Sequence, residues 1–120
     1  MGVRGILCGF LTLAASLPIG AGAPIAMRVS PLVCFAPADI VVTTVIESDP
    51  ANRAILIAAE SRDFYRSSEI QLDGDAAPRT TEFNFRALPT GEYTVTATLF
   101  GANGKFRASS RKLVRVVSTG

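Results

Sequence analysis

The chain has 120 residues, with 12 Lys and Arg against 10 Asp and Glu, and it contains no histidine. Its formal net charge of +2 gives no sign of a nucleic-acid partner, because domains that bind nucleic acids usually carry a marked cationic excess. The lack of histidine excludes Ser-His-Asp and Cys-His catalysis and histidine-ligated zinc. The length fits one small domain.

The N-terminus has the composition of an export signal. Arg4 supplies a positive charge, residues 6–19 are uncharged and apolar, and the residues that follow are small, as a signal peptidase requires. We therefore predict a signal peptide over 1–26, cut between residues 22 and 26, and a single domain over 27–120. The abundance of arginine and alanine is typical of a GC-rich bacterial genome, so the expected location is the periplasm or the medium. An uncleaved membrane anchor is the alternative, because no charge lies between Arg4 and Arg28.

One cysteine, Cys34, lies downstream of the predicted signal, so no intramolecular disulfide is available. Its neighbours Val33 and Phe35 are apolar, which favours a buried thiol that packs like a small apolar side chain. A disulfide between two chains is the alternative.

The segments after Cys34 predict β-strands throughout. Residues 40–46 are a β-branched run that ends at the turn cluster 48–52. Residues 54–59 form a short apolar run, and residues 68–72 alternate before a turn at 73–75.

The clearest alternation lies in the last third of the chain. Phe83 and Phe85 share one face, and residues 93–99 alternate between apolar side chains and threonines, which predicts one buried and one solvent-facing side. Residues 101–104 are expected to close a hairpin, with Asn-Gly supplying positive φ angles, before a final strand over 105–117. Short strands with regular turn signals predict an all-β, antiparallel two-sheet sandwich of six or seven strands.

The segment Leu88-Pro89-Thr90-Gly91-Glu92-Tyr93 resembles the fibronectin type III and bacterial immunoglobulin-like domains. In those families a leucine ends one strand, a Pro/Gly turn follows, and a tyrosine begins the next strand. The resemblance covers residues 80–118 and implies an immunoglobulin-like sandwich. It also implies a structural corner of Leu88, Gly91 and Tyr93, in which the tyrosine hydroxyl caps the backbone. It implies nothing about function.

Two aromatic residues are candidates for partner contact. Phe64 and Tyr65 stand among charges in the segment 62–66, between predicted strands. If exposed, they would form a natural contact site. The alternative is that they cover one end of the core.

A second candidate is basic. The residues concerned fall on strands that should be neighbours, and they would form a patch for an acidic glycan, a lipid headgroup or a protein partner. The alternative is a set of solvated side chains that discourage pairing of the final strand with other chains. The residues are Arg86, Arg107, Arg111, Lys112 and Arg115.

Metal and catalytic sites find little support in the sequence. Asp63, Asp73 and Asp75 supply oxygens for calcium, but the spacing of a calcium loop is missing and a simple turn is favoured. We expect no metal, no cofactor and no catalytic residue. Paired carboxylates are the only hydrolase candidates, either Glu60 with Glu69 or Asp63 with Asp73.

These observations favour a small exported, non-enzymatic domain that contacts an unknown protein partner in the bacterial envelope or outside the cell. A carbohydrate-binding module is the alternative, although the sequence has no tryptophan for sugar stacking. Membrane contact is expected only if the N-terminal segment is retained.

Overall fold

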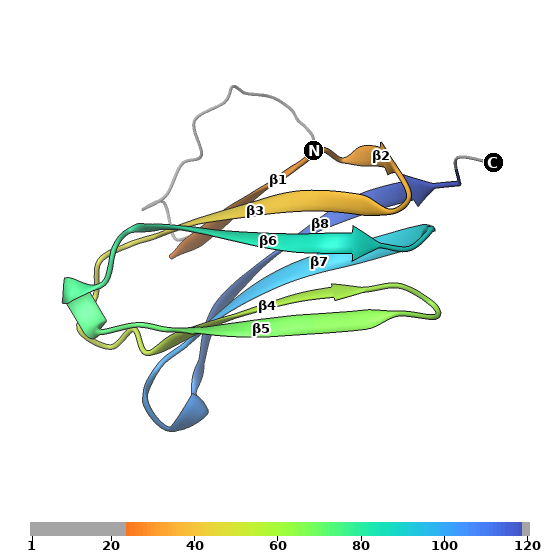
Figure 1. Cartoon of the computed structure of the whole chain (residues 1–120). Helices are drawn as coiled ribbons and strands as arrows, with labels where there is room; N and C mark the ends of the chain where they lie inside the picture. Colours follow the sequence, from red (N-terminus) through yellow and green to blue (C-terminus); the bar gives the residue numbers. More distant parts are fainter. Residues whose placement is uncertain (1–23, 119–120) are drawn as a thin grey trace, which may run out of the picture.

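The computed structural model describes residues 24–118, and the predicted signal peptide lies outside this range up to residue 23. In the described part, the only helices are two 3-10 turns of three residues each, and none is long and apolar enough to cross a membrane. The remaining elements are eight β-strands (Figure 1). They are β1 (Ile25–Ser30), β2 (Val33–Phe35), β3 (Ala38–Ile46), β4 (Ala54–Glu60), β5 (Tyr65–Gln71), β6 (Thr80–Leu88), β7 (Gly91–Phe100) and β8 (Phe106–Val117), with η1 (Gly74–Ala76) and η2 (Ala102–Gly104).

The strands form two sheets, which lie as two layers in Figure 1. One sheet has three strands in the order β1-β3-β6, and the other has five in the order β2-β8-β7-β4-β5. The prediction of an all-β chain with two sheets is therefore confirmed.

Two details of that prediction are wrong. The described residues form eight strands instead of six or seven, and β2 lies parallel to β8 in an otherwise antiparallel arrangement. The three residues of β2 are too few to show an alternating pattern. The pairing of β2 with β8 joins residues about eighty positions apart in the chain, which no local pattern reveals.

The first strand begins before the predicted start of the domain. Ile25 and Ala26 of β1 pair with Ile46 and Val45 of β3, and Ile25 is buried. Cleavage after residue 22 leaves this strand whole, whereas cleavage after residue 26 removes its first two residues.

The core lies between the two sheets. The predicted buried face of β7 is confirmed, because Tyr93, Val95, Ala97 and Leu99 are at most 1% exposed. The hairpin after β7 is also confirmed, since Asn103 has a φ of 59° and Gly104 a φ of 69°. These angles suit asparagine and glycine, which tolerate the left-handed region.

The corner before β7 holds a buried tyrosine. The Tyr93 hydroxyl donates a hydrogen bond of 2.7 Å to the carbonyl oxygen of Pro89, and the Phe64 ring meets the Tyr93 ring edge to face at 6.1 Å. Leu88 is fully buried beside it. A side chain on Gly91 would approach Ser61 Cβ to 3.3 Å, so a small residue fits there.

We expect Tyr93→Phe to lower the free energy of unfolding by about 1–2 kcal/mol, because the Pro89 carbonyl loses its donor in a largely buried place. Tyr65→Phe is the matched control, since Tyr65 is 58% exposed, and it should change stability by less than about 0.5 kcal/mol. Urea unfolding measures both. Equal effects of the two variants would show that the hydrogen bond at the corner contributes nothing.

The same tyrosine predicts a dependence on pH. Burial raises the pKa of Tyr93, while a hydrogen bond with Ser61 and the charge of Arg66 act to lower it. The fold thus favours the neutral phenol, and its contribution is present below pH ~10 and is lost as the pH rises through the raised value. Tyr93→Phe should therefore weaken the alkaline loss of stability.

Candidate functional site

The two predicted contact aromatics have different places in the structure. Phe64 is partly buried against the core, and the Arg66 guanidinium lies 5.0 Å from the centre of its ring. Tyr65, by contrast, is the first residue of β5 and points to solvent. Phe64 therefore covers one end of the core, and only Tyr65 belongs to the surface.

The five predicted basic residues are not brought together. Arg86 lies on β6 in the three-stranded sheet, where its carbonyl oxygen accepts a hydrogen bond from Arg66 Nη1. Arg107, at the start of β8, forms an ion pair of 3.1 Å with Asp49. Because β8 is twelve residues long, Arg107 lies far from the cations near its end.

The predicted calcium and catalytic carboxylates also stay apart. Among residues 24–118, no three His, Cys, Asp or Glu side chains gather as a metal site would require. Glu60 pairs with Tyr65, whereas Glu69 pairs with Leu56, so the two carboxylates are offset by four residues along the sheet. That offset is about 13 Å, wider than the ~9.5 Å that separates catalytic pairs in glycosidases. Asp63 and Asp73 lie beyond opposite ends of β5.

Cys34 is half-buried and packs against the core. Its register opposite the buried Val116 turns it toward the interior of the sandwich. Desolvation by burial raises the pKa of Cys34, so the thiol stays protonated at neutral pH and is a poor nucleophile.

The structure reveals a surface that the sequence analysis missed. Four large apolar side chains are exposed close to the β2 edge of the five-stranded sheet: Leu32 (49%), Val33 (65%), Phe35 (65%) and Leu113 (73%). We call these four residues the apolar corner.

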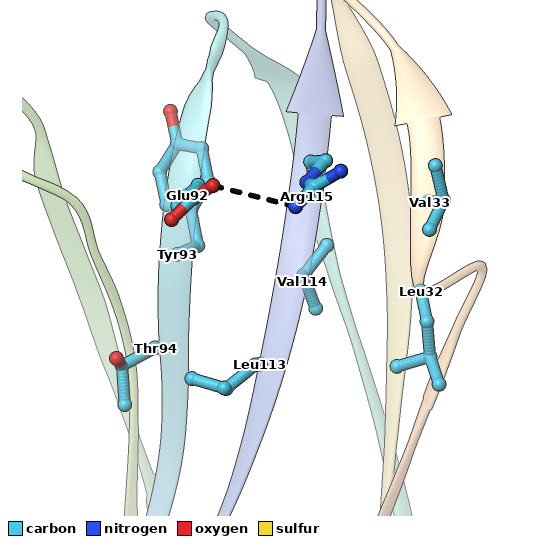
Figure 2. A pocket seen from close by; sticks show the side chains of 8 residues that line it. All are labelled: Leu32, Val33, Glu92, Tyr93, Thr94, Leu113, Val114 and Arg115. Carbon is cyan, nitrogen blue, oxygen red and sulfur yellow. Dashed lines mark ion pairs between the residues drawn. The ribbon is translucent and has the colours of Figure 1, made fainter.

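A groove of about 440 Å³ runs through the apolar corner. Figure 2 shows its lining, with Leu32 and Val33 on the β2 side, Leu113 and Arg115 on β8, and Thr94 on β7. The groove is open to solvent because the short strand β2 pairs with only the last three residues of β8.

Strand register explains why these apolar side chains are outside. Val33 lies opposite Arg115 and Phe35 opposite Val117, so they share the outer face of the sheet with the exposed Arg115. Cys34 takes the inner face instead. In the sequence analysis, the apolar neighbours Val33 and Phe35 served only to favour burial of Cys34.

Cations border the apolar corner on β8. Arg111 is exposed two residues before Leu113 and therefore shares its outer face. Lys112 lies opposite the buried Val95 in the register and takes the other face of the sheet. Arg115 lies 3.6 Å from Glu92, and both side chains are largely exposed, so this pair contributes little to stability. The outer face beside the apolar corner thus has two cations and one anion, a local positive excess.

Comparisons with known proteins show the fold. No protein-family model matches the chain, and no curated protein matches it. Among solved structures, the superoxide reductase (neelaredoxin) from Ignicoccus hospitalis is similar at a TM-score of 0.62, with 14% identity over 78% of this chain and 80% of that chain. A variant of that protein is similar at a TM-score of 0.62, with 15% identity over 80% of this chain and 83% of that chain.

A family 76 glycoside hydrolase from a bovine Bacteroides thetaiotaomicron strain also contains the fold, at a TM-score of 0.56 and 21% identity. The match covers 78% of this chain but 20% of that chain, so this chain spans a small part of the hydrolase. At these identities the likenesses show the fold alone.

The comparisons correct one prediction. The sequence favoured a small exported, non-enzymatic contact domain, but the structures that share the fold over most of their length are superoxide reductases, which are enzymes. Nothing in the comparisons points to an exported contact domain, and that prediction is wrong. The prediction inferred function from the fold class, and sandwich folds carry many unrelated functions.

The residues present do not fit the activity of these neighbours. Reduction of superoxide needs a centre that changes oxidation state, commonly a metal ion held by His, Cys or carboxylate side chains. The sequence has no histidine, and residues 24–118 contain no cluster of three such ligands. No step of that reaction is assigned to this chain.

Proposed function

We propose that this chain is a peripheral docking domain that binds an anionic lipid surface through the apolar corner. One observation carries the proposal: four large apolar side chains are exposed at one edge of the sheet, beside a local excess of cations. Proteins that bind the membrane interface combine apolar side chains that enter the acyl boundary with cations that meet anionic headgroups.

The two parts of this surface contribute in different ways. Transfer of Leu113 or Phe35 from water to the acyl boundary is favourable by up to about 1.5–3 kcal/mol for full burial. Each Lys or Arg near an anionic leaflet adds about 1 kcal/mol, and this part is weakened by salt. Arg111 has no carboxylate partner among the described residues, so it is available to headgroups.

The charge of the surface selects an anionic target over a second copy of the chain. A two-fold contact between identical surfaces brings each patch against itself. Arg111 would then lie near its own equivalent across the contact, which is unfavourable.

Vesicle sedimentation tests the proposal on the chain as recovered from its host. We expect binding to vesicles that contain phosphatidylglycerol, and Leu113→Ser should weaken it about tenfold through the lost apolar transfer. Arg111→Gln should weaken it by about 1 kcal/mol, or roughly fivefold, at low salt. Neutral phosphatidylcholine vesicles report any binding by the apolar N-terminal segment.

Phe106→Ser is the matched control, because Phe106 is 60% exposed but lies at the other end of β8. It should leave vesicle binding unchanged. The proposal fails if Phe106→Ser weakens binding as much as Leu113→Ser does. It also fails if binding to anionic vesicles is unaffected by Arg111→Gln.

We also propose that the sandwich is of the immunoglobulin-like, fibronectin type III-like kind. The support is the hydrogen bond from Tyr93 to Pro89 next to the buried Leu88, which is the corner that the resemblance implies. The comparison of Tyr93→Phe with Tyr65→Phe tests whether this corner stabilises the fold as it does in those domains.

A further inference from the structure

The five-stranded sheet has an uncovered edge at β5. This strand pairs with β4 through all seven of its residues, without a bulge, and no other strand of the described part pairs with it. Figure 1 shows β5 at the outer side of its layer, opposite the edge at β2. A regular, exposed edge strand offers its free backbone groups to another strand.

The hydrogen-bond pattern shows which groups are free. In an antiparallel pair, alternate residues point their N–H and C=O groups toward the neighbouring strand. Leu72 N–H donates to Arg53 at 2.8 Å, and the Phe64 carbonyl accepts from Ser61 N–H at 2.8 Å, so even-numbered residues face the β4 side. The odd-numbered residues of β5 therefore point their N–H and C=O groups away from the sheet. They are Tyr65, Ser67, Glu69 and Gln71.

We propose that two copies of this chain pair through β5, antiparallel and about a two-fold axis at Ser68. The two five-stranded sheets then become one continuous sheet of ten strands. In this register Tyr65 of one copy lies opposite Gln71 of the other, and Ser67 opposite Glu69. The register pairs the whole strand and satisfies every outward backbone group.

The charges of β5 are compatible with a second copy as the occupant, because the strand carries one cation, Arg66, and one anion, Glu69. With the axis at Ser68, Arg66 lies opposite Ile70 and Glu69 opposite Ser67, so no like charges meet. A shift of the axis to Arg66 or to Glu69 would place that charge opposite its own equivalent, which destabilises a strand pair. The axis at Ser68 avoids these contacts and also pairs all seven residues of the strand.

The charged side chains of β5 do not prevent another strand from pairing at this edge. Arg66 Nη1 donates to the carbonyl oxygen of Arg86 on β6, which draws this side chain toward the other sheet. Glu69 accepts a hydrogen bond of 2.7 Å from Gln71 Nε2 on the same strand. β5 also contains no proline and no lysine, two residues that commonly protect edges.

The other edge of this sheet has an unbalanced charge. Arg115 N–H donates to the Leu32 carbonyl at 2.8 Å, so odd-numbered residues of β8 face away from β7. The part of β8 that β2 leaves unpaired contains Arg111 and Lys112 and no carboxylate. Two copies paired along it would bring their cations together, whereas β5 carries one cation and one anion, so β5 is the edge that fits a second copy.

Matched proline variants of the full chain test this proposal. Ser67→Pro removes an outward N–H of β5 and places the proline ring where the second copy would pair, without removing a bond to β4. Ser109→Pro does the same on the free edge of β8. Light scattering should give twice the monomer mass for the wild type and for Ser109→Pro, and Ser67→Pro should dimerise at least tenfold more weakly. A monomeric wild type at millimolar concentration, or an undiminished dimer of Ser67→Pro, would overturn the proposal.

A cross-link tests the register. Ser68 residues at the axis form a non-hydrogen-bonded pair with a Cα separation of about 4.5 Å, within the range that a disulfide spans. In a background with Cys8→Ser and Cys34→Ser, Ser68→Cys should form a disulfide dimer on mild oxidation, and Ser110→Cys on β8 should not. Equal cross-linking of both variants would reject the register. These outcomes are independent of vesicle binding, because the apolar corner lies at the other edge of the sheet.

Discussion

Gly74→Ala is expected to lower the free energy of unfolding by about 2–4 kcal/mol, through backbone strain and a steric clash together. Gly74 has a φ of +55°, a conformation that costs alanine about 1–2 kcal/mol. A Cβ at this position would also lie 2.9 Å from the carbonyl oxygen of Pro50 and 3.2 Å from Arg53 Nη1. The backbone has little room to move, since the Gly74 N–H donates to Asn52 at 3.0 Å.

Gly104→Ala separates the two causes. Gly104 has a φ of +69°, but a Cβ there would meet nothing within 4 Å. This variant should therefore show only the backbone cost of about 1–2 kcal/mol. Urea unfolding of both variants measures the difference. If both variants lower the free energy of unfolding by the same amount, the loop after β5 must move to accommodate the added methyl group, contrary to our expectation.

Phe85→Ala is expected to cost about 3–5 kcal/mol, because a large aromatic side chain leaves a cavity in the core. Phe85 is 1% exposed, and on β6 it lies opposite Ile40 of β3. Its ring meets the Phe83 ring edge to face, with centroids 4.8 Å apart. Truncation thus loses both the buried area and this aromatic contact.

Phe83→Ala provides the matched comparison. Phe83 lies on the same face of the same strand and makes the same ring contact, but it is only partly buried. Its truncation should cost about half as much or less, since the transfer of apolar area scales with burial. Thermal unfolding followed by circular dichroism measures both variants. A larger loss of stability for Phe83→Ala would contradict the deeper placement of Phe85 in the core between the two sheets.

Local pattern was sufficient for much of the fold. The alternation over residues 93–99 identified the buried face of β7, because side chains of a strand point to opposite faces in turn. Asn103 and Gly104 identified the hairpin, because their left-handed angles are a property of the residues themselves. The strands β1 and β2 were missed, since β1 begins within the predicted signal segment and β2 has three residues.

The candidate surface was not predictable in the same way. The sequence suggested a basic patch, but Arg86 and Arg107 lie on different sheets, and Arg107 is paired with Asp49. Val33 and Leu113 are apolar, yet both face solvent. Whether an apolar residue is inside depends on which face of which strand it takes, and a change of one residue in register reverses that face.

The strands with clear alternation, the turn at Asn103 and Gly104 and the lack of histidine chemistry follow from the sequence alone. These depend on residues close together in the chain or on composition. Tertiary packing was needed to show that β2 lies parallel to β8, that four apolar side chains gather at one exposed corner, and that β5 is left as an open edge. These features depend on contacts between distant segments. Such contacts form only when the two sheets pack and bury their shared apolar faces, and no local pattern specifies them.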